Sequence, residues 1–295
     1  MSEKNLQRHV VENIRDFDLD NIFDCGQCFR WVKEEDGSYT GTAFGKIVNM
    51  KTSGDDLSTN LTIENSTEED YQKIWSKYLD MDRDYGMIKK RLSDEDTVIR
   101  EAIQSGPGIR ILKQDLWEAM VSFIISQNNN IPRIKGCIEN LCKLKGEYVG
   151  AYRGKEYFNI PAPEVLAGLK VDDLQPCRLG YRAPYLIDTA RQVIEKGGIE
   201  QVEEDLLKCD TGAKTIGKLL EFQGVGPKVA NCIALFGLGR FDAFPIDVWV
   251  RRVMARLYAI DENNIKAMAS YATEKFKDLG GIAQQYLFYY IRGLD

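Results

Sequence analysis

The run Gly224-Val225-Gly226-Pro227-Lys228 constrains the fold of this chain more than any other stretch. Two glycines one residue apart permit a tight turn with positive φ and leave backbone N–H groups accessible to a phosphate. Proline suits the first position of a helix, and good helix formers follow it. The run therefore predicts two helices, at about 213–222 and 227–237, joined by a turn that can hold a phosphate.

Lys228 falls in the first turn of the second helix, where the helix dipole disfavours a cation. Partial burial would add to this effect and favour the neutral, nucleophilic amine. Nineteen residues later, Asp247 precedes another helical run and can cap it. Separately, Lys228 is explained by a phosphate contact and Asp247 by its cap. Together with the glycine turn they indicate chemistry on DNA.

The chain changes its periodicity near residue 66. Before that point, strand patterns at 29–32, 39–43, 46–50 and 60–63 predict an antiparallel meander. After it, a capping box of Ser66 and Glu69 introduces a mostly helical sequence. We expect further helices at 115–127, 132–143, 182–196, 247–259, 262–278 and 282–292.

These patterns predict an α+β protein of two domains. An N-terminal antiparallel sheet domain with flanking helices, residues 1–114, would pack on an α-helical domain, residues 115–295. A cleft between subdomains is the expected place for catalysis.

The formal net charge of −6 does not suggest a DNA-binding protein, but the basic residues are unevenly distributed. Segment 211–256 holds seven basic and three acidic residues, and segment 127–157 holds six and three. Acidic runs lie elsewhere, at 68–70 and 94–96. This polarity would orient the protein on DNA.

Cysteine and histidine usage excludes several kinds of site. The seven cysteines suit a reducing compartment, and a lone Cys25/Cys28 pair makes a zinc site less favoured than two buried thiols. The single histidine, His9, lies near an N-terminus expected to be frayed and on the surface, which argues against a Ser-His-Asp triad. We expect no signal peptide and no membrane span, and an intracellular protein that is cytoplasmic or nucleoid-associated.

Four more stretches contain conspicuous glycine, amide or aromatic residues. Taken singly, they are explained by a turn before a strand, a helix linker, a helix start and core packing. They are Gly26-Gln27-Cys28-Phe29-Arg30-Trp31, Phe123–Arg133, Leu179–Ala183 and Ala283–Tyr290.

With the glycine turn, these stretches resemble the 8-oxoguanine DNA glycosylase family of the helix-hairpin-helix, Gly/Pro-Asp glycosylases, from about residue 15 to 293. The resemblance implies an α-helical glycosylase domain whose last helix packs back to complete a lesion pocket. No cysteine follows Cys232, so the chain does not resemble the iron-sulfur branch. Trp249 stands where many members have a phosphate-contacting histidine, which leaves that contact open.

The resemblance also implies roles for individual residues. Lys228 and Asp247 would be catalytic, and Gly224 and Gly226 would hold the DNA phosphate. The lesion pocket would use the Gly26 carbonyl on the N7 hydrogen of 8-oxoguanine, with Cys232, Gln284 and Phe288 around the base. The gap that the extruded base leaves in the DNA and the opposite cytosine would be contacted by four residues: Asn128, Arg133, Tyr181 and Arg182.

The implied activity is that of a bifunctional DNA glycosylase/AP lyase acting on double-stranded DNA that contains 8-oxoguanine, preferentially opposite cytosine. We expect a monomer with no organic cofactor; a metal ion held by hairpin backbone carbonyls would only assist phosphate contact. Two alternatives remain open. A monofunctional alkylated-base glycosylase would need Asp247 but not Lys228, and a non-catalytic DNA-binding protein would need only the hairpin.

Overall fold

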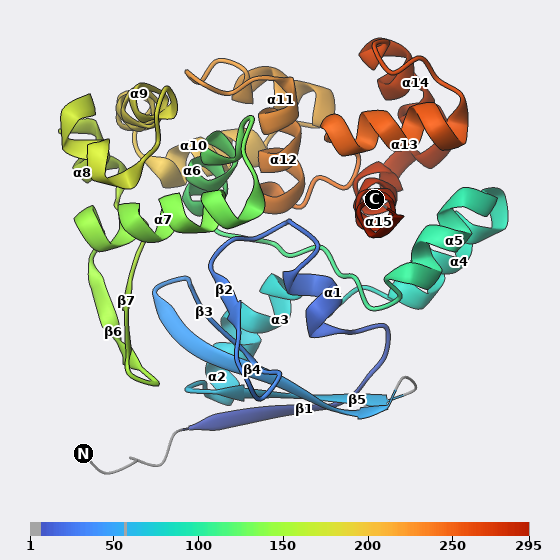
Figure 1. Ribbon diagram of the computed structural model, residues 1–295, viewed down its shortest axis with the longest axis horizontal. Helices are drawn as coiled ribbons and strands as arrows, with labels where there is room; N and C mark the ends of the chain where they lie inside the picture. Colours follow the sequence, from blue (N-terminus) through green and yellow to red (C-terminus); the bar gives the residue numbers. More distant parts are fainter. Residues whose placement is uncertain (1–6, 56–57, 295) are drawn as a thin grey trace.

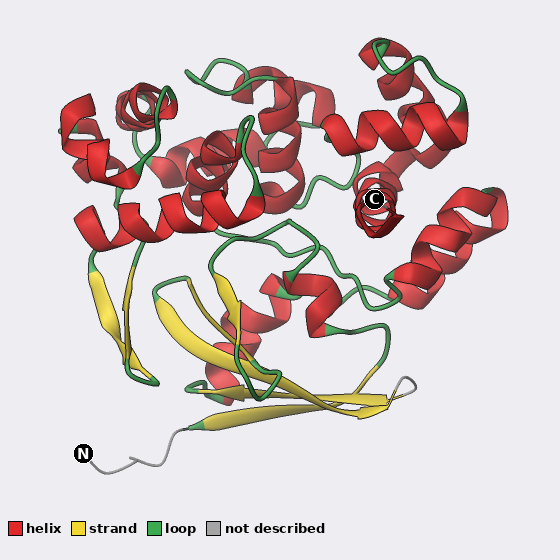
Figure 2. Ribbon diagram, in the orientation of Figure 1, coloured by secondary structure: helices red, strands yellow, loops and turns green. Residues whose placement is uncertain are grey.

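The computed structural model describes residues 7–55 and 58–294, which form a sheet half and a helical half (Figure 1). Figure 2 shows the strands gathered in the lower part of the view and most helices in the upper part. The predicted α+β class is confirmed. Residues 1–6, on which the expectation of no signal peptide depends, lie outside the described residues.

The N-terminal half is built on a five-stranded antiparallel sheet with the order β1-β5-β4-β3-β2. Its strands are β1 (Arg8–Ile14), β2 (Trp31–Lys33), β3 (Tyr39–Ala43), β4 (Lys46–Asp55) and β5 (Ser58–Glu64). The meander from β2 to β5 confirms the prediction. Alternate residues such as Met50 and Ile63 turn inward and are fully buried in the core of this half.

Strand β1 was not predicted, because its sequence mixes charged and apolar residues at an edge of the sheet. The N-terminal residues 1–6, expected to be frayed, lie outside the described residues, and His9 beyond them belongs to β1. His9 pairs with Ile63 of β5, and its ring stacks on Tyr71 with 4.6 Å between centroids. These contacts attach β1 to β5 and to η1.

Short helical segments connect the sheet to the rest of the chain. They are α1 (Leu19–Phe23), α2 (Glu68–Asp70), the π-helical turn η1 (Tyr71–Trp75), α3 (Ser76–Tyr78), α4 (Tyr85–Glu95) and α5 (Thr97–Ser105). The predicted capping box is one residue out of register: Thr67 and Asp70 form it, at 3.0 and 3.2 Å. Ser66 instead donates its backbone N–H to the Gln7 carbonyl and remains in the sheet connection.

The second half consists mainly of helices. They are α6 (Leu116–Ser126), α7 (Ile131–Lys145), α8 (Pro163–Ala167), the 3-10 turn η2 (Val171–Cys177), α9 (Arg182–Glu195), α10 (Ile199–Leu207), α11 (Gly212–Leu219), α12 (Pro227–Leu238), α13 (Val248–Tyr258), α14 (Ile265–Phe276), the 3-10 turn η3 (Lys277–Leu279) and α15 (Gly280–Leu294). Every residue of α6 is buried, so this helix forms the centre of the helical half. An unpredicted hairpin, β6 (Tyr148–Tyr152) and β7 (Lys155–Phe158), reaches back to β4, where Tyr152 and Tyr157 form a small cluster with Ile47.

The two hydrophobic cores divide the chain differently from the predicted boundary at residue 114. Ile99 and Ile103 of α5 belong to the core of the helical half, and α5 packs on α15. The sheet core ends at Leu79 apart from Leu112. Helices α4 and α5 therefore precede the boundary in sequence but belong to the helical half in space.

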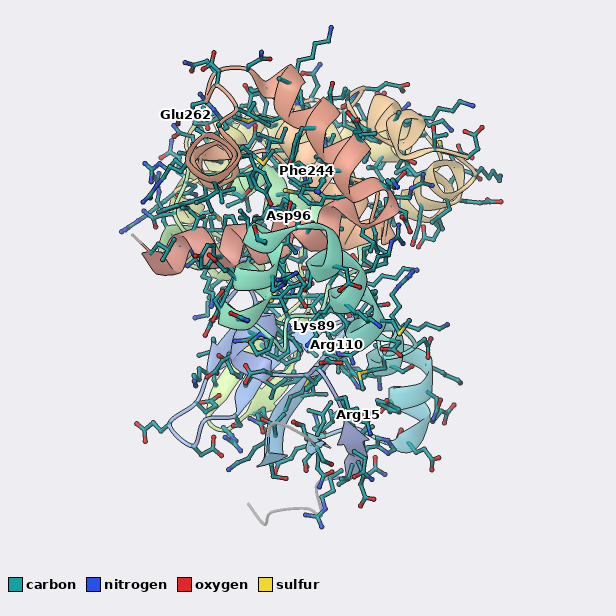
Figure 3. The ribbon with its side chains drawn as sticks, turned by 90° about the vertical axis from the view of Figure 1, so that its right-hand side faces the viewer. Arg15, Lys89, Asp96, Arg110, Phe244 and Glu262 are labelled. Atoms are coloured by element: carbon teal, nitrogen blue, oxygen red, sulfur yellow. The ribbon has the colours of Figure 1, made fainter. Side chains whose placement is uncertain are left out.

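Arg110 and its neighbours join the two halves at a narrow waist (Figure 3). The buried Arg110 guanidinium donates to the carbonyls of Arg15, Asp16 and Asp80 at 2.9, 3.0 and 2.8 Å. Each carbonyl is thereby satisfied away from water, which holds the linker between the halves in one conformation.

Candidate active site

The glycine turn joins α11 to α12, and its two glycines do different things. Gly224 has φ +75°, and a Cβ there would lie 2.5 Å from the Cβ of Tyr185. Gly226 caps α12 with an extended φ of −88°, and its missing Cβ faces open space. The expectation of positive φ therefore holds for Gly224 only, while Gly226 leaves the start of the helix accessible to a ligand.

Lys228 is the second residue of α12, as the sequence predicted. Its Nζ donates to the Ser126 hydroxyl at 3.1 Å and lies 5.4 Å from the centre of the Phe123 ring. Both partners belong to the buried helix α6. The amine is thus held in a partly apolar setting rather than extended into water.

Asp247 caps α13, and its Oδ1 accepts the Val250 N–H at 2.9 Å. Burial raises the pKa of the Asp247 carboxyl, while the Val250 N–H and the positive charge of Lys228 oppose the rise. The positive charge of Lys228 therefore acts on the Asp247 carboxyl across the site and favours its ionised form. Neighbouring Trp249 is half-buried, and the Arg252 guanidinium lies over its ring at 4.8 Å.

Lys228 and Asp247 line one cleft of about 810 Å³. Its walls come from the segment before β2, the end of α6 and the loop after it, the start of α7, the segment before α9, and the helices α12, α13, α14 and α15. Segments from both halves of the chain thus surround one space large enough for a nucleobase and its sugar. The predicted site residues among its lining are Gly26, Asn128, Tyr181, Gly226, Lys228, Cys232, Asp247, Gln284 and Phe288.

Gly26 lies directly against the Phe288 ring. It has φ +80°, and a Cβ would be 3.0 Å from Phe288 Cε1. Glycine is therefore required both by the backbone conformation and by the ring. Phe288 lines the cleft together with Gly26 and Cys232.

Two uncharged polar groups complete this end of the cleft. Gln284 is 4% exposed, and its Oε1 is one of the buried side-chain oxygens without a hydrogen-bond partner in the described chain. Burial raises the pKa of the Cys232 thiol to about 11, although the nearby Lys228 charge opposes the rise. The thiol is neutral at physiological pH, so these two groups present neutral atoms to a ligand, while the Arg292 guanidinium, 5.3 Å from the centre of the Phe288 ring, adds a positive charge at this end of the cleft.

The loop between α6 and α7 carries the residues expected on the opposite-base side. Asn128 is exposed with φ +46°, a conformation that Asn tolerates. Arg133 is exposed in the first turn of α7, where its N–H is capped by Asn130 at 3.0 Å. Tyr181 is 50% exposed and donates to the Gln127 carbonyl at 3.2 Å. These positions suit a wedge and a reader of DNA, and the roles stay predictions.

Arg182 is placed differently from Arg133. It is 3% exposed, and its guanidinium donates to the carbonyls of Gln127, Asn128 and Leu179 at 2.9, 3.0 and 3.2 Å. It therefore holds the loop of Asn128, and neither arginine lines the cleft. Contact of Arg182 with a cytosine would require an exchange of these partners.

The uneven charge of segment 127–157 is largely neutralised in the fold. Carboxylates lie within 4.0 Å of four of its six basic side chains, and some belong to the sheet half. These four are Lys135, Lys143, Arg153 and Lys155. The expected basic face in this segment is thus reduced chiefly to exposed Arg133.

Sequence reasoning missed several residues that organise the site. Ser126 accepts from Lys228, and Gln127 donates to the Gly224 carbonyl at 2.9 Å, so the end of α6 holds the hairpin. Gln285 and Gln114 bind carbonyls around Gly26. The only signal for Gln285 was an uncharged amide inside an apolar run, and Gln114, between Lys113 and Asp115, offered no such signal.

Metal ligands of the usual side-chain types are not assembled in the described part of the chain, which holds no group of three or more His, Cys, Asp or Glu. Cys25 and Cys28 are buried free thiols near the Ile22 and Phe23 carbonyls, as the alternative to zinc predicted. A metal ion on hairpin carbonyls stays a prediction.

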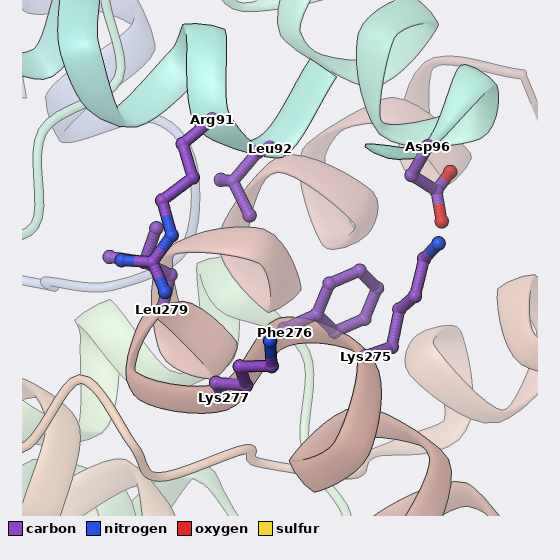
Figure 4. A pocket seen from close by; sticks show the side chains of 7 residues that line it. All are labelled: Arg91, Leu92, Asp96, Lys275, Phe276, Lys277 and Leu279. Atoms are coloured by element: carbon purple, nitrogen blue, oxygen red, sulfur yellow. The ribbon is translucent and has the colours of Figure 1, made fainter. Parts of the chain in front are cut away.

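A second cavity lies between α4 and the end of α14 (Figure 4). Its volume of about 20 Å³ has room for a single water. None of the residues that line it belongs to the predicted site.

Among the helices of residues 7–55 and 58–294, none has the length and apolar character needed to cross a membrane.

Comparisons with known proteins agree with this geometry. Residues 9–120 match the family model "8-oxoguanine DNA glycosylase, N-terminal domain", and residues 121–278 match "HhH-GPD superfamily base excision DNA repair protein". The solved Clostridium acetobutylicum 8-oxoguanine glycosylase/lyase, in complex with DNA containing cytosine opposite the lesion, is 39% identical with a TM-score of 0.90 and covers 100% of this chain and 99% of its own.

Two curated relatives extend the comparison. A probable N-glycosylase/DNA lyase of Methanothermobacter thermautotrophicus is 32% identical over 67% of this chain and 68% of its own length. The N-glycosylase/DNA lyase of Saccharomyces cerevisiae is 30% identical over 83% of this chain and 69% of its own. The chain belongs to the 8-oxoguanine DNA glycosylase family within the HhH-GPD superfamily of base-excision repair proteins.

Proposed function

We propose that this protein is a bifunctional DNA glycosylase/AP lyase that removes 8-oxoguanine from duplex DNA, preferentially opposite cytosine. The observation that carries the proposal is one cleft that holds an amine, a carboxyl and a set of neutral groups suited to a purine. Its relatives' names support the same reaction class.

Recognition would depend on the hydrogen at N7. Guanine has an acceptor at N7, whereas 8-oxoguanine has an N–H there, so the Gly26 carbonyl attracts the lesion and repels guanine. Phe288 would stack on the extruded base opposite Cys232. The Gln284 Oε1, which has no partner in the described chain, would accept a hydrogen bond from an N–H group on the edge of the base.

Lys228 would then act as the nucleophile. Its neutral Nζ forms a bond to C1′ as the C1′–N9 bond breaks, and the departing base takes a proton. Opening of the sugar ring gives a Schiff base. Loss of a C2′ proton and cleavage of the C3′–O bond complete the β-elimination and cut the strand 3′ to the lesion.

Asp247 would stabilise the positive charge that develops on the sugar during departure of the base. Its position supports this role, because the carboxyl faces the cleft and interacts with the Lys228 charge. Gly226 and the first N–H groups of α12 would bind the backbone phosphate. A metal ion on hairpin carbonyls would assist only that contact.

The cytosine preference would come from Arg133 and Arg182, with Asn128 filling the gap and Tyr181 acting as a wedge. Two guanidinium groups directed at one base discriminate strongly among the four bases. Exposed Arg133 is ready for this contact, whereas Arg182 would first release the carbonyls of Gln127 and Asn128.

Borohydride trapping on a duplex with 8-oxoguanine opposite cytosine tests the proposal. We expect a covalent protein–DNA adduct with the wild type and none with Lys228→Gln. Base release without any adduct would favour the monofunctional alternative, and binding without base release would favour the non-catalytic one. An unchanged adduct in Lys228→Gln would refute Lys228 as the nucleophile.

A further inference from the structure

The three residues Cys25-Gly26-Gln27 lie between α1 and β2, and Gly26 among them lines the cleft. We propose that two buried amides, Gln285 and Gln114, are positioning residues that hold the Gly26 carbonyl in the orientation that selects 8-oxoguanine. This inference rests on the proposed function, since it concerns how the lesion is distinguished from guanine.

The carbonyls on either side of Gly26 are both bound by these amides. Gln285 Nε2 donates to the Cys25 carbonyl at 2.6 Å, and Gln114 Nε2 donates to the Gln27 carbonyl at 2.7 Å. Arg292 also reaches the Asp24 carbonyl at 3.4 Å. Within residues 7–55 and 58–294, no hydrogen bond to the Gly26 carbonyl is formed. It is the one carbonyl of this run left for a ligand.

The Gln27 side chain fixes the loop from the other side. It is fully buried, and its Nε2 donates to the carbonyls of Ile22 and Arg110, each at 2.8 Å. Its Oε1 accepts the Leu112 N–H at 2.8 Å. Every hydrogen-bonding atom of this amide head is thereby used, so rotation of the loop would break several buried bonds.

The orientation of the Gly26–Gln27 peptide follows from its N–H group. Burial raises the pKa of the Cys25 thiol to about 12, and the Gln27 N–H beside the sulfur opposes the rise. Because the peptide is planar and trans, its carbonyl points the opposite way from that N–H. The carbonyl is therefore directed away from the Cys25 thiol.

Both positioning residues are attached to elements that carry the chemistry. Gln285 adjoins Gln284 on α15, the helix that also presents Phe288. The Gln114 N–H donates to the Phe236 carbonyl of α12 at 2.7 Å, and α12 carries Lys228. The carbonyl that reads the base is thus set relative to both the stacking ring and the nucleophile.

Two activities of the same enzyme distinguish a loss of positioning of the Gly26 carbonyl from a general loss of stability. Excision of 8-oxoguanine needs the Gly26 carbonyl, whereas cleavage of a preformed abasic site needs Lys228 but no base recognition. We would measure both under single-turnover conditions, opposite cytosine, in Gln285→Met and Gln114→Met. Methionine keeps the length of the side chain and removes the donor. Gln201→Met, at an exposed residue of α10, is the matched control.

We expect excision to fall about 10- to 100-fold in each variant, as for a lost buried hydrogen bond, with abasic-site cleavage changed less than about threefold. The double variant should lose less than the product of the single losses, because both amides hold the same Gly26 carbonyl in place. Gln201→Met should leave both rates unchanged.

Equal losses of excision and abasic-site cleavage, or no loss in either, would overturn the inference. Thermal unfolding of each variant identifies a folding defect, and since the two amides lie on different segments, either variant alone can decide. If the wild type released no 8-oxoguanine, the proposed function itself would fail. If the wild type released it and the variants kept the ratio of the two rates, only the inference would fail.

Discussion

The segment around Gly26 and the loop before α7, which the proposed function assigns to the lesion and to the opposite base, are built in opposite ways. Around Gly26, the neighbouring carbonyls and the Gln27 amide are bound by buried groups, and the Gly26 carbonyl has no hydrogen-bond partner among residues 7–55 and 58–294. In the second region, exposed Asn128 lies in a left-handed conformation, and Arg182 is occupied by the loop's own carbonyls.

Under the proposed function, the lesion would be recognised by groups already fixed in the free protein, whereas recognition of the opposite base would require a rearrangement. A preorganised donor or acceptor needs no reorganisation when the ligand arrives. A guanidinium that must leave three carbonyls loses its hydrogen bonds to them when it forms the new contact with the base. Lesion specificity should therefore be robust, and opposite-base preference easier to alter.

The largest effect is expected from a change to the chemical step itself, which leaves both of these regions as they are. Asp247→Asn keeps a capping side chain on α13 but removes the charge, so excision should fall about 10²–10³-fold. Lesion binding and cytosine preference should remain close to those of the wild type, because neither region is changed. Single-turnover excision and equilibrium binding check this; unaffected turnover would reduce Asp247 to a helix cap.

Gly26→Ala tests the preorganised segment around Gly26. Its positive φ and the Phe288 ring 3.0 Å from a new Cβ both resist the change, so excision should fall about 10- to 100-fold. Gly37→Ala is the matched control, with φ +79° and nothing within 4 Å. It bears the same backbone strain outside the cleft. Equal excision by the two variants would contradict a role for Gly26 in recognition.

The opposite-base region is tested by comparing two arginines. Arg133→Gln, at an exposed site, should reduce the preference for cytosine about tenfold with little change in Tm. Arg182→Gln should reduce the preference similarly and lower Tm by roughly 5 °C, because buried carbonyls lose their donor. Excision opposite each of the four bases, with thermal unfolding, provides the data. Equal rates opposite all four bases in the wild type would refute the preference.

The smallest effect concerns stability and pH. Because burial raises the pKa of Asp247, this carboxyl stabilises the fold at low pH and loses that contribution as pH rises through its raised pKa. The Tm of Asp247→Asn relative to the wild type should therefore increase from about pH 4 to pH 7. Thermal unfolding of both proteins across this range checks the prediction. If the pKa of Asp247 were not shifted, the difference in Tm between the variant and the wild type would stay constant.

Local sequence patterns predicted the local parts of this fold well. The meander, the hairpin of α11 and α12 and the cap on α13 each depend on neighbouring residues, and each was found. Strand β1 and the β6–β7 hairpin were missed because their stability comes from partners distant in sequence, Ile63 and Ile47 among them.

The residues of the site divide in the same way into those that a local pattern predicts and those that depend on partners distant in sequence. The placement of Lys228 and Asp247 at helix starts was predictable from the glycine turn and the capping position. The Ser126 partner of Lys228 and the Gln285 contact to Cys25 span 102 and 260 residues, and no local pattern encodes them. Burial of Arg182 against the Gln127 carbonyl was equally invisible in sequence.

The central claim is that the Lys228 amine forms the bond to the sugar, and peptide mapping of the borohydride-reduced adduct tests it most directly. Trypsin should fail to cleave after a modified Lys228, so the DNA remnant should be found on the peptide Leu219–Arg240. That mass, obtained from wild type reacted with 8-oxoguanine opposite cytosine, is the predicted result. A remnant on any other residue, or base release with no adduct at all, would contradict the account.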